Sequence, residues 1–353
     1  MADDRSDRVS SNRSIRRGSV ALTTAIASPE TDMPTAILPD RYTRENLLRA
    51  LGNPRLFRRE LFSLALSVNA RASRLREFGD GAGVDVIAAD WDNLILLDAC
   101  RYDLFERRST LEGELSAVRS KGSDSWEFMA ANFDGRALHD TVYVTANPHV
   151  YELEDDTFHA VVDLLESHWD EKTGTVLPED VVEQTLVAAD RYPEKRLIVH
   201  FMQPHFPFLG PTGREFPQQA IDTHLPEGER SEVQNPWLGL LASGEVDLES
   251  VMAAYRENFD LVIPHVAELL DALEGKSVVS ADHGNLVGER GFPIPLRMYG
   301  HPRGLRHEGL LTVPWLEVES TDRRRIVAEP PLDIGTGADE GLVEERLRAL
   351  GYV

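Results

Sequence analysis

The run of residues 278–284, VVSADHG, constrains the fold of this chain more than any other segment. Its small and β-branched residues predict a buried strand, which delivers Asp282, His283 and a turn-forming Gly284 at its carboxyl end. Open α/β sheets place their reactive groups at that edge. A carboxylate beside an imidazole suits a divalent metal, and a plain strand followed by a polar loop is the simpler alternative.

The rest of the chain predicts strands that alternate with helices. Apolar runs predict further strands, and amphipathic spacing predicts helices between them. The strands are expected at 93–98, 141–145, 197–202 and 277–281, and the helices at 125–133, 178–190 and 249–274. This alternation predicts an α/β fold, a three-layer αβα sandwich with a mostly parallel central sheet.

The domain organisation is predicted to be simple. Residues 1–42 are expected to form a disordered N-terminal tail, and residues 43–353 a single domain. Leucines within 43–78 predict two leading helices that are interrupted at Asn53 and Pro54. The stretch 206–248, rich in Pro, Gly and Glu, predicts an irregular insertion able to overhang a site.

The charge of the chain limits its partners. Sixty acidic residues against thirty-seven Lys and Arg give a formal charge of −23, and only four of the basic residues are Lys. An acidic surface poor in Lys indicates adaptation to high intracellular salt, with attraction of a cationic partner as the alternative. Nucleic acid is not an expected partner, because phosphate backbones need a basic face.

The cellular compartment is predicted from cysteine content and from the first residues. Cys100 is the only cysteine, so an intrachain disulfide cannot form, which is typical of a reducing compartment. No run approaches the roughly twenty apolar residues of a transmembrane helix. We therefore expect a cytoplasmic protein. Arg16 and Arg17, followed by a short apolar run, leave twin-arginine export as the alternative.

Two carboxylates are predicted to meet at one edge of the sheet. Asp98 and Asp282 each follow an apolar strand, so one metal can bind both although they are 184 positions apart. The alternative for Asp98 is to cap the following helix. Asp103 is expected to pair with Arg101 or to cap that helix. Cys100 could be a nucleophile, but a buried inert thiol is the commoner role.

A hydroxyl nucleophile is predicted within residues 120–127, SKGSDSWE. Ser123 or Ser125 would stand at the start of a helix, where free amides and the helix dipole stabilise anionic oxygens. Metal coordination would lower the pKa of the hydroxyl and make it an attacking group. The alternative is that both serines simply cap the helix.

Three histidines are candidates for the same site. His205 follows a predicted strand between Pro204 and Pro207, where it could contact a metal or an anionic substrate. His301 and His307 precede the apolar run 310–316, and one of them is expected to face the site. His200, inside a strand, is assigned a structural role, and His149 a place on the surface or in a helix.

These parts, in this order, resemble the alkaline phosphatase and sulfatase superfamily over residues 90–353. The resemblance rests on the strand ending in Asp98, a serine about 27 residues later, Pro204-His205-x-Pro, the Asp282-His283-Gly284 strand and a later His before Val313-Pro314-Trp315. The run 92–103, DNLILLDACRYD, is the closest single match, and it is most similar to sulfatase-like proteins of halophilic archaea.

The resemblance implies a metal site and an unmodified nucleophile. It implies that Asp98, Ser125, Asp282 and His283 hold one metal, with His205, His301 and His307 available to a second. Formylglycine sulfatases carry paired Asp residues and Cys/Ser-x-Pro-x-Arg; here Ala99 follows Asp98 and the pentapeptide is missing. This favours the phosphodiesterase, phosphomutase and phosphoglycerol transferase branches.

The predicted function follows from that resemblance. We expect a metal-dependent hydrolase or transferase of phosphate esters or phosphodiesters, acting through a covalent serine intermediate with His205 assisting. The metal would be Mn, Zn, Mg or Ca. The substrate would be a small-molecule, glycan or lipid-headgroup ester. The alternatives are a sulfuric ester hydrolase with an unmodified nucleophile and an inactive binding protein on the same fold.

Overall fold

The computed structural model describes residues 54–76, 83–216, 237, 240–241, 246–332 and 340–351. The predicted tail 1–42, the first of the two leading helices and most of the insertion 206–248 lie outside the described residues. The domain boundary at residue 43 therefore stays a prediction.

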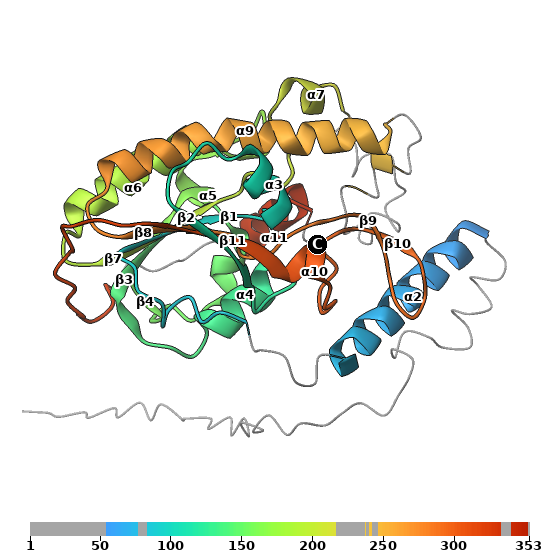
Figure 1. Ribbon diagram of the computed structural model, residues 1–353, viewed down its shortest axis with the longest axis horizontal. Helices are drawn as coiled ribbons and strands as arrows, with labels where there is room; N and C mark the ends of the chain where they lie inside the picture. Colours follow the sequence, from blue (N-terminus) through green and yellow to red (C-terminus); the bar gives the residue numbers. More distant parts are fainter. Residues whose placement is uncertain are drawn as a thin grey trace, which may run out of the picture. The chain divides into compact units, whose positions relative to one another are not determined.

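A seven-stranded sheet forms the centre of the part of the chain that the structure describes (Figure 1). Five neighbouring strands are parallel, whereas β11 is antiparallel to both of its neighbours. The order across the sheet is β2 (Glu114–Arg119), β11 (Thr312–Val318), β8 (Ser277–Ser280), β1 (Asn93–Leu97), β7 (Arg196–Phe201), β3 (Leu138–Thr145) and β4 (Phe158–Asp163). The predicted α/β fold with a mostly parallel sheet is confirmed.

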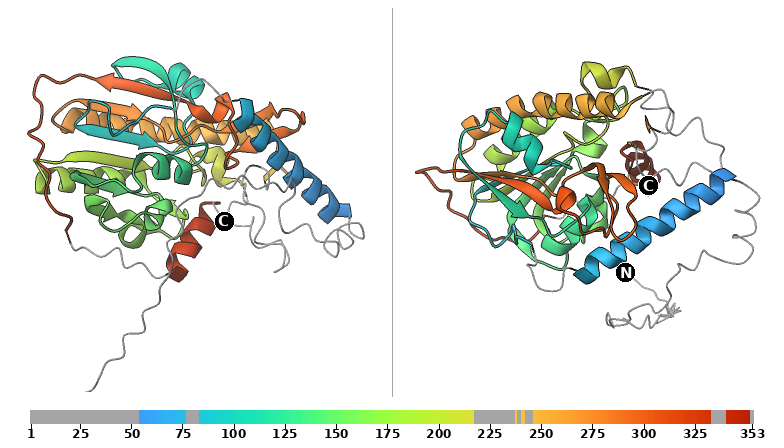
Figure 2. Two further views of the ribbon diagram at one scale, coloured as in Figure 1. Left: turned by 90° about the horizontal axis from the view of Figure 1, so that it is seen from below. Right: turned by 45° about the vertical axis from the view of Figure 1, so that its right-hand side comes forward.

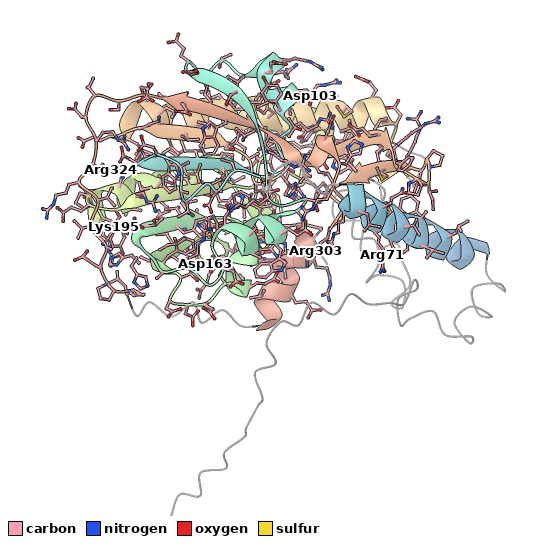
Figure 3. The ribbon with its side chains drawn as sticks, turned by 60° about the horizontal axis from the view of Figure 1, so that its bottom comes forward. Arg71, Asp103, Asp163, Lys195, Arg303 and Arg324 are labelled. Atoms are coloured by element: carbon pink, nitrogen blue, oxygen red, sulfur yellow. The ribbon has the colours of Figure 1, made fainter. Side chains whose placement is uncertain are left out.

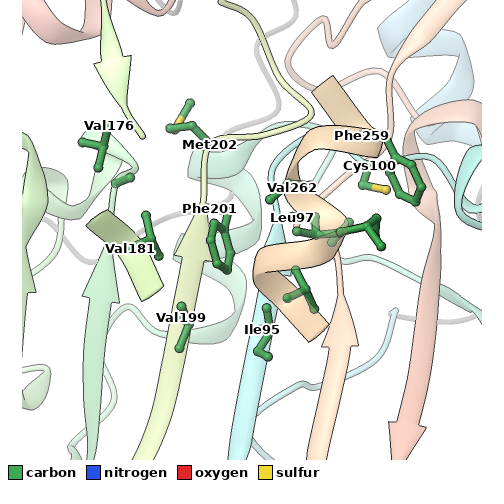
Figure 4. Close-up of a cluster of buried hydrophobic side chains, with 14 of the residues drawn as sticks. Ile95, Leu97, Cys100, Val176, Val181, Val199, Phe201, Met202, Phe259 and Val262 are labelled. Atoms are coloured by element: carbon green, nitrogen blue, oxygen red, sulfur yellow. The ribbon is translucent and has the colours of Figure 1, made fainter. Parts of the chain in front are cut away.

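Side chains on the central strands alternate between two hydrophobic cores. Ile95 and Leu97 of β1 face the core that contains Phe259 and Val262 of helix α9 (Leu248–Ala272), as Figure 4 shows. Leu94 and Leu96 face the other core, with Phe128 of helix α4 (Ser125–Asn132). One core on each face of the sheet makes three layers, as predicted.

Helices cover both faces of the sheet (Figure 1). α9, α6 (Pro178–Arg191) and α3 (Tyr102–Arg108) pack on one face, and α4 with the 3-10 helix η1 (Pro148–Glu152) on the other. The remaining elements are α5 (Leu164–Ser167), α7 (Pro211–Arg214), α10 (Glu308–Leu311), α11 (Glu340–Ala349), and the two-stranded pairs β5 (Trp169–Asp170) with β6 (Thr175–Val176) and β9 (Leu286–Arg290) with β10 (Arg297–Gly300).

The sequence analysis missed the two outer strands of the sheet. β2 reads ELSAVR and is partly exposed along its length, so it lacks the continuous apolar run of the inner strands. β4 reads FHAVVD, with a histidine among its apolar residues. His159 in this strand is buried. Outer strands carry polar residues because one side has no partner strand.

Helix α2 (Pro54–Arg76) begins at the proline predicted to separate the two leading helices. It contacts the β9–β10 hairpin through Asn69, whose Nδ2 donates to Ile294 O at 2.9 Å and whose Oδ1 accepts from Ile294 N at 2.9 Å. Figure 2 shows α2 beside this hairpin from two further directions. Among the described helices, none combines the length and the apolar character that crossing a bilayer requires.

Candidate active site

The predicted meeting of two carboxylates takes place at the carboxyl ends of β1 and β8. These strands are parallel neighbours, so Asp98 and Asp282 lie side by side, and both are fully buried. The amides of Ala99 and His283 donate to Asp282 Oδ1 at 3.1 and 2.7 Å. Burial alone would raise the pKa of Asp282, but the imidazoles of His283 and His200 and the Ser125 hydroxyl outweigh it and hold this pKa below its usual range.

Ser125 is the first residue of α4 and its hydroxyl lies between the two carboxylates. Ser125 Oγ donates to Asp282 Oδ2 at 2.6 Å, and it lies 3.3 Å from Asp98 Oδ2 and 3.3 Å from His283 Nε2. The side chain is fully buried. The hydroxyl has one proton and can donate it to only one of these neighbours at a time. The Ser125 oxygen therefore lies where a cation could bind it or where the hydroxyl could lose its proton.

Ser123, the other candidate nucleophile, has a different environment. Its Oγ donates to Glu127 Oε2 at 2.7 Å and accepts from Gly304 N at 2.9 Å. Asp124 caps α4 by accepting from Glu127 N at 2.8 Å. The Ser123 hydroxyl therefore already has one acceptor and one donor at the start of the helix. The structure therefore places Ser125 beside the carboxylates and Ser123 in the support of the helix end.

His283 points Nε2 toward the serine. Its Nδ1 lies 2.7 Å from Gly284 O and donates to that carbonyl, so Nε2 carries the lone pair. Nε2 lies 3.5 Å from Asp282 Oδ2 and 3.7 Å from Asp98 Oδ1. The predicted ligand set Asp98, Ser125, Asp282 and His283 thus converges on one point.

His200 belongs to the same cluster, although the sequence analysis assigned it a structural role. Its Nε2 lies 3.7 Å from Asp282 Oδ2, and its Nδ1 lies 2.8 Å from the Tyr143 hydroxyl. The sequence offers only the two-residue period of the strand, and the register that places His200 beside the carboxylates comes from the structure. His200 pairs with Leu96, and Leu96 faces the same side of the sheet as Asp98.

Asp98, His200 and Asp282 can hold a metal ion. One ligand atom from each lies within 4.8 Å of the others, and all three side chains are buried. Two carboxylates buried so closely are costly unless a cation neutralises them. A mixed oxygen and nitrogen donor set fits Zn or Mn, and such a set is less typical of Ca. The chemistry of the residues therefore fits the predicted divalent metal, whose identity stays a prediction.

Asn147 is a site residue that the sequence analysis missed. Its Nδ2 donates to Asp98 Oδ2 at 2.7 Å, and its Oδ1 accepts from His149 N at 3.0 Å as the cap of η1. Asn147 follows β3, at the same sheet edge as Asp98. Its position just after a predicted strand is the sequence feature that could have identified it as a site residue.

His149 is buried, which corrects its assignment to the surface or a helix. Its Nδ1 contacts Glu152 Oε1, and its ring lies 6.5 Å from that of Trp126, measured between centroids. A carboxylate on Nδ1 orients the imidazole and leaves Nε2 as the atom that can exchange a proton.

His205 and His301 face one another across the site. Their Nε2 atoms are 2.9 Å apart, and His205 Nδ1 donates to Phe206 O at 2.6 Å. The His301 ring lies 4.7 Å from the His283 ring. Burial lowers the pKa of His205 to about 4 and holds that of His301 well below its usual value, so both rings are neutral near pH 7.

His307 does not join this group. It is the N-cap residue that precedes α10, and its Nδ1 accepts from Gly309 N at 3.0 Å. Of the two histidines between which the sequence did not choose, the structure brings His301 next to His283 and uses His307 as a helix cap.

The residues after Asp98 have the structural roles that were predicted. Arg101 Nε pairs with Asp103 Oδ1 at 2.7 Å, which confirms the predicted salt bridge. Burial raises the pKa of the Cys100 thiol well above its usual value, and the side chain packs in the core that contains Phe259. A thiol held protonated in this way is not a nucleophile.

Comparisons with known proteins give weak similarities. No family model and no curated protein matches the chain. It is similar to the integral membrane protein lipooligosaccharide phosphoethanolamine transferase A from Neisseria meningitidis, with 14% identity and a TM-score of 0.41 over 78% of this chain and 59% of that one. The chain thus spans less than two thirds of that protein.

Two other solved structures are also similar. The C-terminal periplasmic domain of EcEptC from Escherichia coli, in complex with Zn, has 13% identity and a TM-score of 0.41 over 68% of this chain and 76% of that one. The phosphonate monoester hydrolase SpPMH from Silicibacter pomeroyi has 16% identity and a TM-score of 0.26 over 49% and 38%. Similarities of this size carry no argument about activity, and the resemblance to sulfatase-like proteins of halophilic archaea stays a prediction.

Proposed function

We propose that this chain is a metal-dependent enzyme that hydrolyses or transfers phosphate esters or phosphodiesters through a covalent intermediate on Ser125. The observation that carries the proposal is the position of the Ser125 hydroxyl, buried at the start of a helix within 3.3 Å of Asp98, Asp282 and His283. A structural cap needs one hydrogen-bond partner, whereas this hydroxyl is surrounded by two carboxylates and an imidazole from the ends of two different strands, β1 and β8.

The metal would be held by Asp98, Asp282, Ser125 and a neighbouring imidazole of His283 or His200. A divalent ion at such a site lowers the pKa of a coordinated hydroxyl and neutralises charge on a phosphoryl oxygen.

The chain itself supplies the first proton acceptor and the anion-binding end of a helix. Asp282 Oδ2, 2.6 Å from Ser125 Oγ, accepts the hydroxyl proton. The amide dipoles at the start of α4 favour negative charge beside Ser125. Ser125 Oγ then forms a bond to phosphorus as the bond to the ester oxygen breaks, and the departing oxygen takes up a proton. Water or a second alcohol releases the phosphoryl group from Ser125 in the next step.

His205, His301 and His149 are proposed to serve the leaving group. The first two rings are neutral at pH 7, so they line the site without adding fixed charge. Because His205 Nδ1 donates to Phe206 O, its Nε2 accepts from His301 Nε2, and that one N–H of His301 is the group that can turn to a phosphate oxygen instead. His149 is oriented by Glu152 and lies close enough to affect the pKa of both rings electrostatically. It is our candidate for delivering the proton to the departing oxygen.

Trapping the covalent intermediate tests the proposal. The protein is incubated with an aryl phosphate, an aryl phosphodiester or an aryl sulfate in Mn, Zn, Mg or Ca, quenched in acid, digested and analysed by mass spectrometry. With the aryl phosphate we expect one phosphoryl group on Ser125, and with the aryl phosphodiester one phosphoryl group that still carries its second ester substituent. A sulfuryl group on Ser125 with the aryl sulfate alone would favour the sulfuric ester alternative instead.

Two variants make the test specific. Ser125→Ala should lose both the modification and about a thousandfold or more of the turnover, as removal of an attacking group does. Ser123→Ala is the matched control and should still be modified on Ser125, with a stability loss of about 1 kcal/mol from the helix cap. Full turnover by Ser125→Ala with metal bound would refute the nucleophile. Metal binding without turnover of any ester would favour an inactive binding protein.

A further inference from the structure

Exposed apolar side chains gather at one place on the molecule. Among the described residues, six large hydrophobic side chains are exposed, and four of them lie on α2 or in the turn between β9 and β10. These four are Leu61 (55% exposed), Leu75 (59%), Phe292 (59%) and Ile294 (37%). We call them the α2 surface. Large exposed apolar groups that cluster mark a site of interaction more often than single ones do.

Helix α2 carries exposed apolar side chains in addition to those that pack on the protein. Its docked side contains the buried Ala65 and Asn69, with Leu66 and Ala70 packed against the small core under β9 and β10. A second apolar stripe has members three, seven and fourteen residues after Leu61; it comprises Leu61, Leu64, Val68 and Leu75, of which Leu64 and Val68 are partly buried. Leu61 and Leu75, at its two ends, are more than half exposed.

The turn between β9 and β10 extends the same surface. The Asn69 side chain donates to Ile294 O and accepts from Ile294 N, so this turn is fastened to the middle of α2. The turn carries Phe292 and Ile294, and Figures 1 and 2 show the hairpin alongside the helix.

The charge of α2 is opposite to that of the rest of the chain. The helix contains six arginines and one glutamate, a formal charge of +5, whereas the whole chain carries −23. The remainder of the chain therefore carries −28. Arg71 and Arg74 are exposed, and Figure 3 labels Arg71 projecting from the helix. Basic charge and exposed leucines on one helix are the features of a helix that lies in a membrane interface.

We propose that the α2 surface docks on an anionic lipid membrane. The exposed leucines and Phe292 would enter the headgroup boundary while the exposed Arg71 meets lipid phosphates. The acidic remainder of the protein would be repelled by the same lipids, so only this face could approach them. A second copy of the chain fits less well, because pairing α2 with α2 would bring two helices of charge +5 together.

Docking there would bring the membrane close to the candidate active site. Arg74 donates from Nε to Gly304 O at 3.1 Å and from Nη2 to Glu127 Oε1 at 3.2 Å. Glu127 lies in the first turn of α4, two residues after Ser125, and Gly304 lies three residues after His301. The inference goes beyond the proposed chemistry, because lipid binding needs no turnover.

Co-sedimentation of the full chain with lipid vesicles tests the inference. We expect binding to phosphatidylglycerol vesicles that exceeds binding to phosphatidylcholine vesicles and weakens as salt is raised. Leu61→Glu with Leu75→Glu should weaken binding about tenfold or more, and Arg71→Glu about fivefold. Val187→Glu is the matched control, because Val187 is a comparably exposed apolar residue (53%) on α6, and it should bind like the original protein. Circular dichroism confirms that each variant is folded.

Three outcomes would overturn the inference. One is that neither kind of vesicle binds, and another is that Val187→Glu weakens binding as much as the two leucine substitutions. The third is a dimer in light scattering that the leucine substitutions dissociate while vesicles remain unbound, which would assign the α2 surface to a second copy. Ser125→Ala should bind vesicles unchanged, so failure of the proposed chemistry and failure of the membrane contact are distinguishable.

Discussion

Asn147 donates a hydrogen bond of 2.7 Å from Nδ2 to Asp98 Oδ2. The two residues follow β3 and β1, which are separated in the sheet by β7. The bond therefore spans the end of the strand that carries His200. Through its Oδ1, Asn147 also holds the backbone of His149, so one amide side chain connects a predicted metal ligand with the candidate proton donor.

Replacing Asn147 should weaken the metal site without removing a ligand. We expect Asn147→Ala to lower metal affinity about tenfold to a hundredfold, as loss of a partner that orients a ligand does. Calorimetric titration with Zn or Mn measures the change. Thr145→Val is the control, because Thr145 Oγ1 accepts from Asn147 N, at 3.0 Å, and the bond from Asn147 to Asp98 remains when that contact is removed. Equal losses in both variants would indicate a general loosening of the loop.

His200 and His307 should differ in metal binding. His200 lies beside both buried carboxylates, so His200→Ala should lower metal affinity at least about tenfold. His307→Ala removes a helix cap and should leave metal affinity unchanged while lowering stability by about 1 kcal/mol. The two effects are read from metal titration and urea unfolding. A larger loss of metal affinity in the His307 variant would show that the cluster is wrongly assigned.

The backbone at Ala99 is strained, and glycine should relieve it. Ala99 has a φ of 57°, a left-handed conformation that a residue with a Cβ adopts at a cost of about 1 to 2 kcal/mol. Ala99→Gly removes this cost but gains unfolded-state entropy, so we expect a free energy of unfolding equal to or up to about 1 kcal/mol above the original. Ala281→Gly, also beside a site carboxylate, should lower it by about 1 kcal/mol. A lower free energy of unfolding in Ala99→Gly would contradict the inference that the backbone is strained at Ala99.

The stability of the protein should fall in acid in part because of Asp85. Its hydrogen bond with Arg136, helped by Lys121, holds the pKa of the Asp85 carboxyl well below its usual range despite partial burial. The unfolded chain then binds the proton first, so this contribution is complete above about pH 4 and is lost as pH falls further. In Asp85→Asn the free energy of unfolding should therefore fall less steeply with decreasing pH below about pH 4.

The partner substitution provides the check on that assignment. Arg136→Gln should have the same effect on this pH dependence, and the double variant should add little, because both remove one interaction. An unchanged slope in Asp85→Asn would mean that other carboxyls dominate acid unfolding.

The inner strands and the two carboxylates were predictable from local sequence. Short apolar runs mark β1 (LILL), β7 (LIV) and β8 (VV), because strands buried on both faces are rich in apolar residues. Parallel strands end at the same edge, so Asp98 and Asp282 could be placed together without knowledge of the contacts. The start of α4 was also readable from its capping residues.

Only the tertiary structure decided between residues of similar local pattern. Ser123 and Ser125 are both near a helix start, but the direction of α4 turns Ser125 toward Asp282, 157 positions away, and Ser123 toward Gly304. The same holds for His301 and His307, and for His200, whose role depends on its register against β1. The local sequence indicates the period of apolar residues, the helix caps and the turns. Which side chains contact one another is determined by the packing of helices and strands that are far apart along the chain.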